Sequence, residues 1–257
     1  MSSWIQLALK LVQQLAESQA EAMESAARIA MRSIAEGGVV YTFGTGHSRI
    51  PVEEFFPRYG SYPGFQPVVE LSMTFHTQVV GSNGQRQAMF IERTEGLAAE
   101  ILANYRLRPV DSMFIFSVSG INAVPIEMAI GAREAGLPVV AVTSMRETMA
   151  CAPWQRSGTR LCDYADVIID LGSPAGDALC KVPGLTVPVG PVSTFAAIAI
   201  VNEIKVRVAE LLVERDAMPP VITSEQLVGS DQSAASFEGA YNEFARRWAA
   251  ALRTSAT

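Results

Sequence analysis

The chain has 257 residues, of which 49% are hydrophobic and 18% charged, and its formal net charge is −6. This length and hydrophobic content can support one large domain or two small ones, and we expect one α/β domain with helical extensions. The acidic balance and the lack of a Lys/Arg cluster exclude a dedicated nucleic-acid-binding protein, because such proteins carry a concentrated basic surface.

The N-terminal region has a helical apolar pattern from Trp4 to Ala35, which ends at Gly37 and Gly38. The pattern predicts a helical segment over residues 1–36 that packs on the core, and its apolar stripe is equally suited to a second subunit. Polar residues such as Lys10 interrupt it, and no apolar span of about 18 residues follows a basic start. We therefore expect a cytoplasmic protein with no membrane partner.

The central region, residues 37–214, alternates short β-rich runs with helical stretches. Such alternation predicts parallel strands with helices on both faces of the sheet. Helices are expected to begin near Ser48, Glu95 and Ala123, and a long one to run from Val192 to Val213. The expected strands are Val39 to Phe43, Gln66 to Leu71, Met113 to Phe116, Val139 to Thr143 and Val167 to Leu171.

The C-terminal part begins after a Pro/Gly-rich loop, Gly172 to Pro191, with a short strand expected near Lys181, and after the long helix. Two prolines, at 219 and 220, break the chain before a helical segment around Phe237 to Leu252. Residues 215–257 are therefore predicted to form a helical extension, with the aromatic spacing of a docked face at Tyr241, Phe244 and Trp248.

The three cysteines have neither CxxC spacing nor an even count, which fits free thiols in a reducing compartment and gives no support for a metal site. A dinucleotide fingerprint is considered because Gly44-Thr45-Gly46 follows a strand. The third glycine of that fingerprint would fall at Arg49, and the first acidic residue at the end of the next strand is Glu70, beyond the usual spacing of about 20 residues. No cofactor is expected.

Two loops carry the strongest functional signal, Phe43-Gly44-Thr45-Gly46-His47-Ser48 and Ser117-Val118-Ser119-Gly120-Ile121-Asn122. Each follows a predicted strand and precedes a predicted helix, so N–H groups, hydroxyls and a helix N-terminus can converge on a phosphate. In the second loop Asn122 is expected to cap the helix, and an ordinary capped helix is the alternative explanation of that loop alone. With a flavodoxin-like strand order 2-1-3-4-5, both loops open into one crevice.

These residues resemble the sugar isomerase (SIS) domain family of phosphosugar-binding proteins over roughly Val39 to Val213. The overall pattern is similar to phosphoheptose isomerases and N-acetylmuramic acid 6-phosphate etherases. The resemblance rests on the two loops, with Pro125-Ile126-Glu127 after the second loop and Val140-Ala141-Val142-Thr143-Ser144 on the next strand.

The resemblance implies a five-stranded parallel sheet in a three-layer αβα sandwich, in a homodimer or homotetramer, with a sugar phosphate held by the serine-rich loop. Many family members have Thr where this chain has Asn122, whose amide can also donate to phosphate. The predicted substrate-binding residues are Gly44, Thr45, Gly46, Ser48, Ser117, Ser119, Gly120, Asn122, Thr143, Ser144 and Lys181.

Acid and base candidates are few. Aldose–ketose isomerisation needs a base of near-neutral pKa and a group that protonates the carbonyl oxygen. Glu53 and Glu54 lie on the helix after the first loop, and His47 lies inside that loop. Each carboxylate can equally be a solvated charge near a helix N-terminus, and His76 is as consistent with packing as with catalysis. A solvated loop lysine is likewise the simpler explanation of Lys181.

The sequence thus predicts an enzyme that abstracts a proton from a sugar or amino-sugar phosphate, as an isomerase or as a lyase that cleaves an ether. The residues do not choose between these reactions, because the same base serves both. The alternatives are a phosphosugar sensor that acts through a protein partner, and a purely structural subunit.

Overall fold

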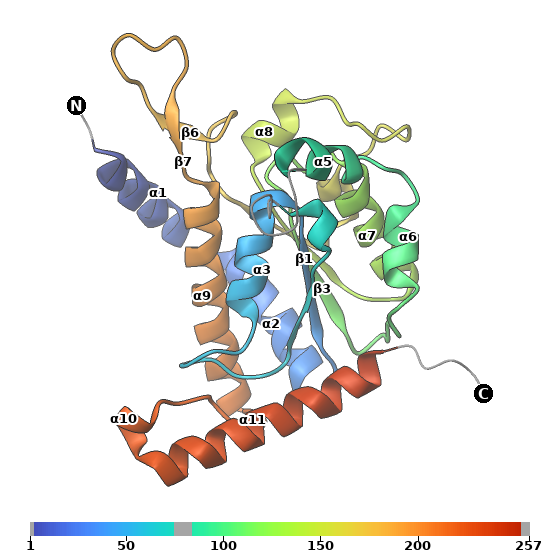
Figure 1. The fold of residues 1–257 in the computed structure, drawn as a ribbon, viewed down its shortest axis with the longest axis vertical. Helices are drawn as coiled ribbons and strands as arrows, with labels where there is room; N and C mark the ends of the chain where they lie inside the picture. Colours follow the sequence, from blue (N-terminus) through green and yellow to red (C-terminus); the bar gives the residue numbers. More distant parts are fainter. Residues whose placement is uncertain (1–2, 75–83, 253–257) are drawn as a thin grey trace.

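The computed structural model describes residues 3–74 and 84–252, and its centre is a parallel five-stranded sheet (Figure 1). The strand order is β2-β1-β3-β4-β5, which confirms the flavodoxin-like order. The second strand ends earlier than predicted, because the chain turns into a 3₁₀ segment at Leu71–Met73. The strands are β1 (Val40–Gly44), β2 (Phe65–Val68), β3 (Ser112–Phe116), β4 (Val139–Thr143) and β5 (Val167–Asp170).

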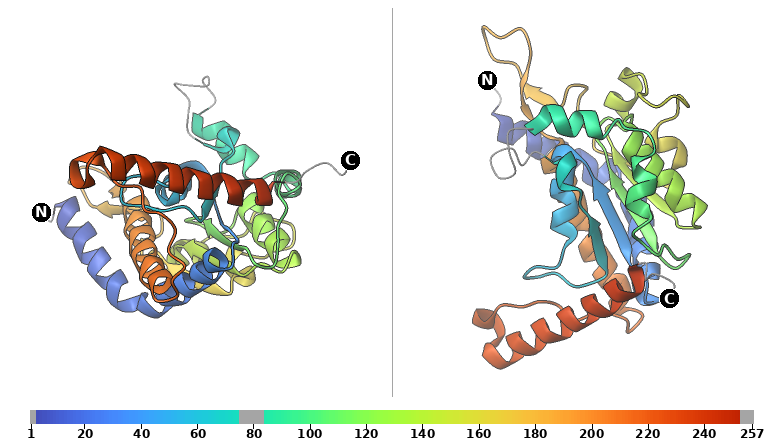
Figure 2. Two further views of the ribbon diagram at one scale, coloured as in Figure 1. Left: turned by 90° about the horizontal axis from the view of Figure 1, so that it is seen from below. Right: turned by 45° about the vertical axis from the view of Figure 1, so that its right-hand side comes forward.

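Helices cover both faces of the sheet and make the three predicted layers (Figure 2). One face packs against α2 (Ala20–Ala35), α3 (Arg49–Phe55) and α9 (Ser193–Val213), and the other against α6 (Leu97–Leu102) and α7 (Ala123–Glu134). Successive strand residues point to opposite faces, so apolar runs that are buried on both sides become central parallel strands. Val40 packs in the first layer and Tyr41 in the second, both fully buried.

The N-terminal segment is two helices rather than one continuous helix. It breaks at Gln19, between α1 (Trp4–Ser18) and α2. The Gln19 side chain accepts a 2.9 Å hydrogen bond from the Asp170 backbone N–H at the end of β5. This tertiary contact has no counterpart in the apolar periodicity, which continues through the break.

The expected loop between Gly172 and Pro191 contains an antiparallel hairpin, β6 (Ala178–Cys180) with β7 (Val189–Pro191), that projects from the body beside α1 (Figure 1). Trp4 ties α1 to it, since its indole N–H donates to the Gly190 carbonyl at 3.1 Å. Two short helices near the carboxyl ends of the strands were not predicted, α5 (Gly84–Ile91) and α8 (Met145–Ala150). The three cysteines are free, as predicted.

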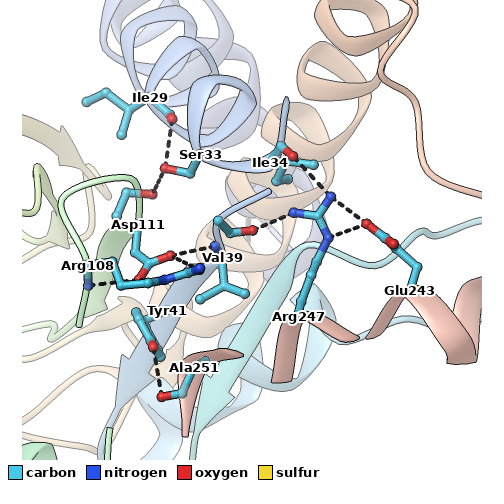
Figure 3. Close-up of polar contacts among 12 residues, drawn as sticks. Ile29, Ser33, Ile34, Val39, Tyr41, Arg108, Asp111, Glu243, Arg247 and Ala251 are labelled. Atoms are coloured by element: carbon cyan, nitrogen blue, oxygen red, sulfur yellow. Dashed lines mark hydrogen bonds and ion pairs between the residues drawn. The ribbon is translucent and has the colours of Figure 1, made fainter. Parts of the chain in front are cut away.

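The C-terminal region forms α10 (Glu225–Val228) and the long α11 (Ser230–Ala251), which lies across the amino-terminal end of the sheet (Figure 1). The buried guanidinium of Arg247 donates to the Ile34 carbonyl at 3.0 Å, to the Gly38 carbonyl and to Glu243 (Figure 3). The predicted docked face is present in part, because Trp248 packs edge-on against Tyr105.

Beside Arg247 the carboxylate of Asp111 is fully buried. It accepts hydrogen bonds from the Val39 backbone N–H at 2.9 Å and from the Arg108 backbone N–H at 3.0 Å, and it pairs with the Arg108 guanidinium at 2.7 Å (Figure 3). These bonds fix the start of β1 against the loop before β3. The division into segments 1–36, 37–214 and 215–257 remains a prediction.

Candidate functional site

A cavity of about 570 Å³ opens at the carboxyl ends of β1 and β3. The loops after both strands line it, as the predicted sheet order requires. The end of α5, the segment around α8 and the start of α9 complete its walls.

The first loop turns tightly as it leaves β1. A Cβ atom at Gly44 would lie 2.2 Å from the Ser48 carbonyl oxygen, so only glycine fits there. Beyond it Thr45, Gly46, His47 and Ser48 line the cavity.

The second loop turns back at Gly120, whose φ is +62°. Its N–H donates to the Ser117 hydroxyl at 3.2 Å, and Ser117, Ser119 and Asn122 line the cavity. Asn122 occupies the N-cap position of α7, but its side chain forms no capping bond, contrary to the expectation. Its amide N–H instead donates to Glu92 at 2.9 Å, and its buried Oδ1 has no hydrogen-bond partner among the described residues.

Glu92, immediately after α5, is a half-buried carboxyl group that sequence reasoning missed. It accepts the Thr45 hydroxyl on one oxygen and the Asn122 amide on the other, so it joins the two loops. Burial raises its pKa above the ordinary value of 4.5, against the opposing effects of the Thr45 hydrogen bond and the nearby charge of Arg93. Glu92 is distant in sequence from both loops, so neither loop pointed to it. Glu92 and Arg93 also resemble part of an ordinary solvent-exposed run of charged residues.

The far wall holds two more carboxylates, each engaged by backbone N–H groups. Glu147 accepts from Gly176 at 2.6 Å, and Asp177 accepts from the Ser193 N–H at 2.8 Å and hydroxyl at 2.6 Å. Asp177 thereby closes the N-terminus of α9, where Ser193 and Thr194 line the cavity. Within residues 3–74 and 84–252, no group of three or more His, Cys, Asp or Glu side chains could hold a metal ion.

Comparison with known proteins identifies the family, since the SIS domain model matches residues 3–144. The chain belongs to the SIS domain family. It is 30% identical over 242 residues to a UPF0309 protein of Listeria monocytogenes serotype 4b, a match that covers 94% of this chain and 96% of the relative. A UPF0309 protein of Brucella anthropi is 36% identical over 214 residues, which covers 83% of this chain and 84% of the relative.

Solved structures show the same fold. The phosphoheptose isomerase of Francisella tularensis matches this SIS chain with a TM-score of 0.52 and 15% identity, over 81% of this chain and 95% of that one. The phosphoheptose isomerase of Neisseria gonorrhoeae gives a TM-score of 0.51 and 15% identity, over 79% and 93%. The resemblance inferred from the two loops is confirmed at the level of family and fold.

Four of the predicted binding residues in this SIS protein lie outside the lining of the cavity, namely Gly44, Gly120, Thr143 and Ser144. Thr143 donates to the Val118 carbonyl at 3.1 Å, and Ser144 donates to the Ser173 carbonyl at 2.8 Å. Both side chains are fully buried and hold neighbouring loops in place. Gly120 sits above Thr143, since a Cβ there would approach the Thr143 hydroxyl to 3.0 Å.

The three predicted residues Glu53, Glu54 and Lys181 are not brought to the cavity. Glu53 pairs with Arg49 at 2.6 Å and keeps 54% of its side chain exposed. Glu54 pairs with Arg58 at 3.2 Å. In each case an arginine one turn away along the chain holds the carboxylate. Lys181 is exposed on the projecting hairpin. His76 lies outside the described residues.

No helix among the described residues has the length and apolar character needed to span a membrane.

Proposed function

We propose that this cavity binds a sugar phosphate. Residues that line it then transfer a proton to and from a carbon beside the carbonyl group of the sugar. One observation carries the proposal: the loops after two adjacent parallel strands place hydroxyls, a helix start and a half-buried carboxyl of raised pKa around one cavity. SIS membership and the fold shared with phosphoheptose isomerases support it.

The phosphate is assigned to the loop from Ser117 to Asn122. In the first turn of α7 the Val124 N–H donates to the Glu92 carbonyl at 3.0 Å, and Pro125 has no N–H. The donors assigned to the anion therefore belong to the loop before the helix, and the dipole of α7 favours negative charge there. The Ser119 hydroxyl lines the cavity with no hydrogen bond inside the described protein, so it can donate to phosphate. Thr45, Gly46 and Ser48 face the same space from the other loop.

Proton transfer is assigned to Glu92 and His47, which both line the cavity. A carboxyl whose pKa is raised by burial is a stronger base when ionised and is more readily protonated again, as an enediol intermediate requires. In isomerisation the base removes the proton from the carbon beside the carbonyl while the second group protonates the carbonyl oxygen, which gives the enediol. The proton then returns to the former carbonyl carbon as the neighbouring hydroxyl gives up its own proton and becomes the new carbonyl. In ether elimination the same abstraction is followed by loss of the alkoxide, which takes up a proton.

The test is a melting-temperature panel of hexose, heptose and N-acetylhexosamine 6-phosphates, each beside its unphosphorylated sugar. A ligand at about 100 times its dissociation constant adds about 2.7 kcal/mol to the stability of the folded state. We expect stabilisation by a phosphorylated compound and none by its parent sugar. The stabilising compound is then incubated in D₂O, where exchange of a substrate C–H indicates an enzyme. Binding without exchange indicates a sensor, and no stabilisation by any phosphosugar contradicts the proposal.

We also propose that the protein forms a homodimer or homotetramer in the cytoplasm. The helix α1 exposes Ile5 (64%) and Leu9 (54%), and the adjacent hairpin exposes Leu185 (54%) and Val187 (65%). Exposed apolar side chains on both elements favour a protein partner. Light scattering coupled to size-exclusion chromatography measures the assembly, and a monomer at micromolar concentration would contradict it.

A further inference from the structure

Arg93 occupies an unusual position in the wall of the cavity. Among the described residues, every other arginine that is not exposed forms a hydrogen bond or an ion pair within the protein. Within residues 3–74 and 84–252 the Arg93 side chain forms neither, and its buried Nε atom has no hydrogen-bond partner there. A partly desolvated guanidinium that lacks an acceptor is costly unless a ligand supplies one.

The guanidinium is nevertheless held in a defined place. Its central carbon lies 4.0 Å from the ring centroid of Trp154, which orients the planar group and leaves its edge available. The carboxylates opposite do not use it, because Glu147 and Asp177 are engaged by backbone N–H groups. Glu92 attracts it electrostatically but directs its two oxygens to Thr45 and Asn122.

Arg93 also stands between two spaces. It lines the main cavity and an adjoining outer hollow of about 620 Å³, whose other walls include Arg86, Phe90 and Trp154. A sugar in the main cavity can therefore carry a substituent past Arg93 into the outer hollow.

From this arrangement we propose that Arg93, stacked on Trp154, recognises a second anionic group of the substrate. The substrate is thus a sugar phosphate with a carboxylate or a second phosphate on a substituent separate from the phosphate that the serine loop holds. The inference rests on the proposed function, since it assumes that a sugar phosphate occupies the main cavity. A guanidinium suits either anion because its N–H groups match two oxygens at once.

The experiment is calorimetric titration of the full chain with two matched pairs of compounds. N-acetylmuramic acid 6-phosphate differs from N-acetylglucosamine 6-phosphate by an ether arm that ends in a carboxylate. Glucose 1,6-bisphosphate differs from glucose 6-phosphate by a second phosphate. We expect the doubly anionic member of at least one pair to bind about tenfold or more tightly than its partner, as a charge-assisted pair predicts. The pair that shows the preference identifies the anion.

Three variants assign the preference to a residue. R93Q should remove it while the affinity for the singly phosphorylated partner stays within about threefold. R93K, which keeps the charge but loses the planar stacked group, should reduce the preference several-fold and serves if R93Q folds poorly. R32Q is the matched control, because Arg32 is exposed on α2 and lines neither the main cavity nor the outer hollow, and it should leave the preference unchanged.

Two kinds of failure are distinguishable. Equal affinity within both pairs, survival of the preference in R93Q, or equal weakening of both members by R93Q would overturn the inference while phosphosugar binding stands. Absence of binding by all four compounds would contradict the proposed function and the inference with it.

Discussion

Buried charged side chains at the two ends of the sheet differ in whether the protein supplies their hydrogen-bond partners. At the amino-terminal end, Asp111 and Arg247 are 0% and 5% exposed, and each makes several hydrogen bonds within the chain. At the carboxyl end, Asn122 Oδ1 and Arg93 Nε are buried beside a cavity and have no hydrogen-bond partner in the part of the chain that the structure describes, and burial raises the pKa of Glu92.

This difference indicates that the buried groups at one end of the sheet stabilise the fold, whereas those at the other end serve ligand binding. A satisfied buried network fixes one arrangement of the chain, and removing one of its members leaves other groups unpaired. Polar atoms left without partners at a cavity are destabilising in the free protein and become favourable when a ligand supplies the missing bonds. Substitutions at the amino-terminal end should therefore change stability, and those at the carboxyl end should change binding or turnover.

The largest expected effect is on turnover in the E92Q variant. Glutamine keeps the shape of the side chain but cannot abstract a proton, so deuterium exchange into the stabilising phosphosugar should slow by about 10²- to 10⁴-fold. Phosphosugar affinity should change little. E53Q, at an exposed carboxylate held by Arg49, is the control and should exchange at the wild-type rate. Normal exchange in E92Q would remove Glu92 from the mechanism.

The next effect is on stability at the opposite end of the sheet. R247M leaves the Ile34 and Gly38 carbonyls without their donor and should lower the free energy of unfolding by about 3 to 5 kcal/mol. R246M is the matched control, because Arg246 immediately precedes Arg247, pairs with the same Glu243 and keeps 59% of its side chain exposed. It should cost less than about 1 kcal/mol. Chemical denaturation measures both, and equal costs would show that burial does not distinguish the two arginines.

Substitution of Gly120, at the carboxyl end of the sheet, should affect both stability and phosphosugar binding. G120A places a methyl group about 3 Å from the Thr143 and Thr148 hydroxyls at a φ of +62°. We expect a loss of about 1 to 3 kcal/mol in stability and at least about tenfold in phosphosugar affinity, because the serine loop must shift.

The control for this substitution is G60A. Gly60 has a φ of +76° with nothing within 4 Å of an added Cβ, so the strain is present without the crowding. It should cost about 1 kcal/mol and leave binding intact. Wild-type affinity in G120A would separate the loop from the phosphate site.

The smallest expected effect is the pH dependence of stability that Glu92 contributes. Its pKa in the folded state lies above 4.5, so the folded protein holds this proton more tightly than the unfolded chain. Stability from this group is present below about pH 4.5 and is lost as pH rises through the raised pKa. Relative to wild type, E92Q should therefore become more stable as the pH rises from 4.5 to 8. A difference that is constant with pH would contradict the raised pKa.

Much of the fold follows from the sequence because buried parallel strands are short apolar runs, bounded by loops with distinct turn residues. Val139–Thr143 begins and ends where the pattern predicts, and α9 begins one residue later than predicted. Contacts between distant segments leave no such pattern. The Asp170 N–H bonds to Gln19 at the break of the N-terminal helix, and Arg247 anchors α11, whose sequence is mostly polar.

The site was predicted in part for the same reason. Loops that follow neighbouring strands must meet, so the serine and glycine loops could be paired from sequence alone. The orientation of a carboxylate on α3 could not be predicted in this way. It depends on an ion pair with an arginine one turn away, as Glu53 forms with Arg49. Glu92 reaches the site because the end of α5 lies beside the cavity, and no local sequence pattern indicates this position.

The most direct test is a crystal structure of the protein with the phosphosugar that stabilises it most. Our account predicts phosphate oxygens about 2.7 to 3.2 Å from the Ser119 hydroxyl and from backbone N–H groups of the Ser117–Asn122 loop, with the sugar carbonyl end toward Glu92 and His47. A phosphate bound elsewhere in the cavity, with the Ser117–Asn122 loop empty, would contradict the central claim.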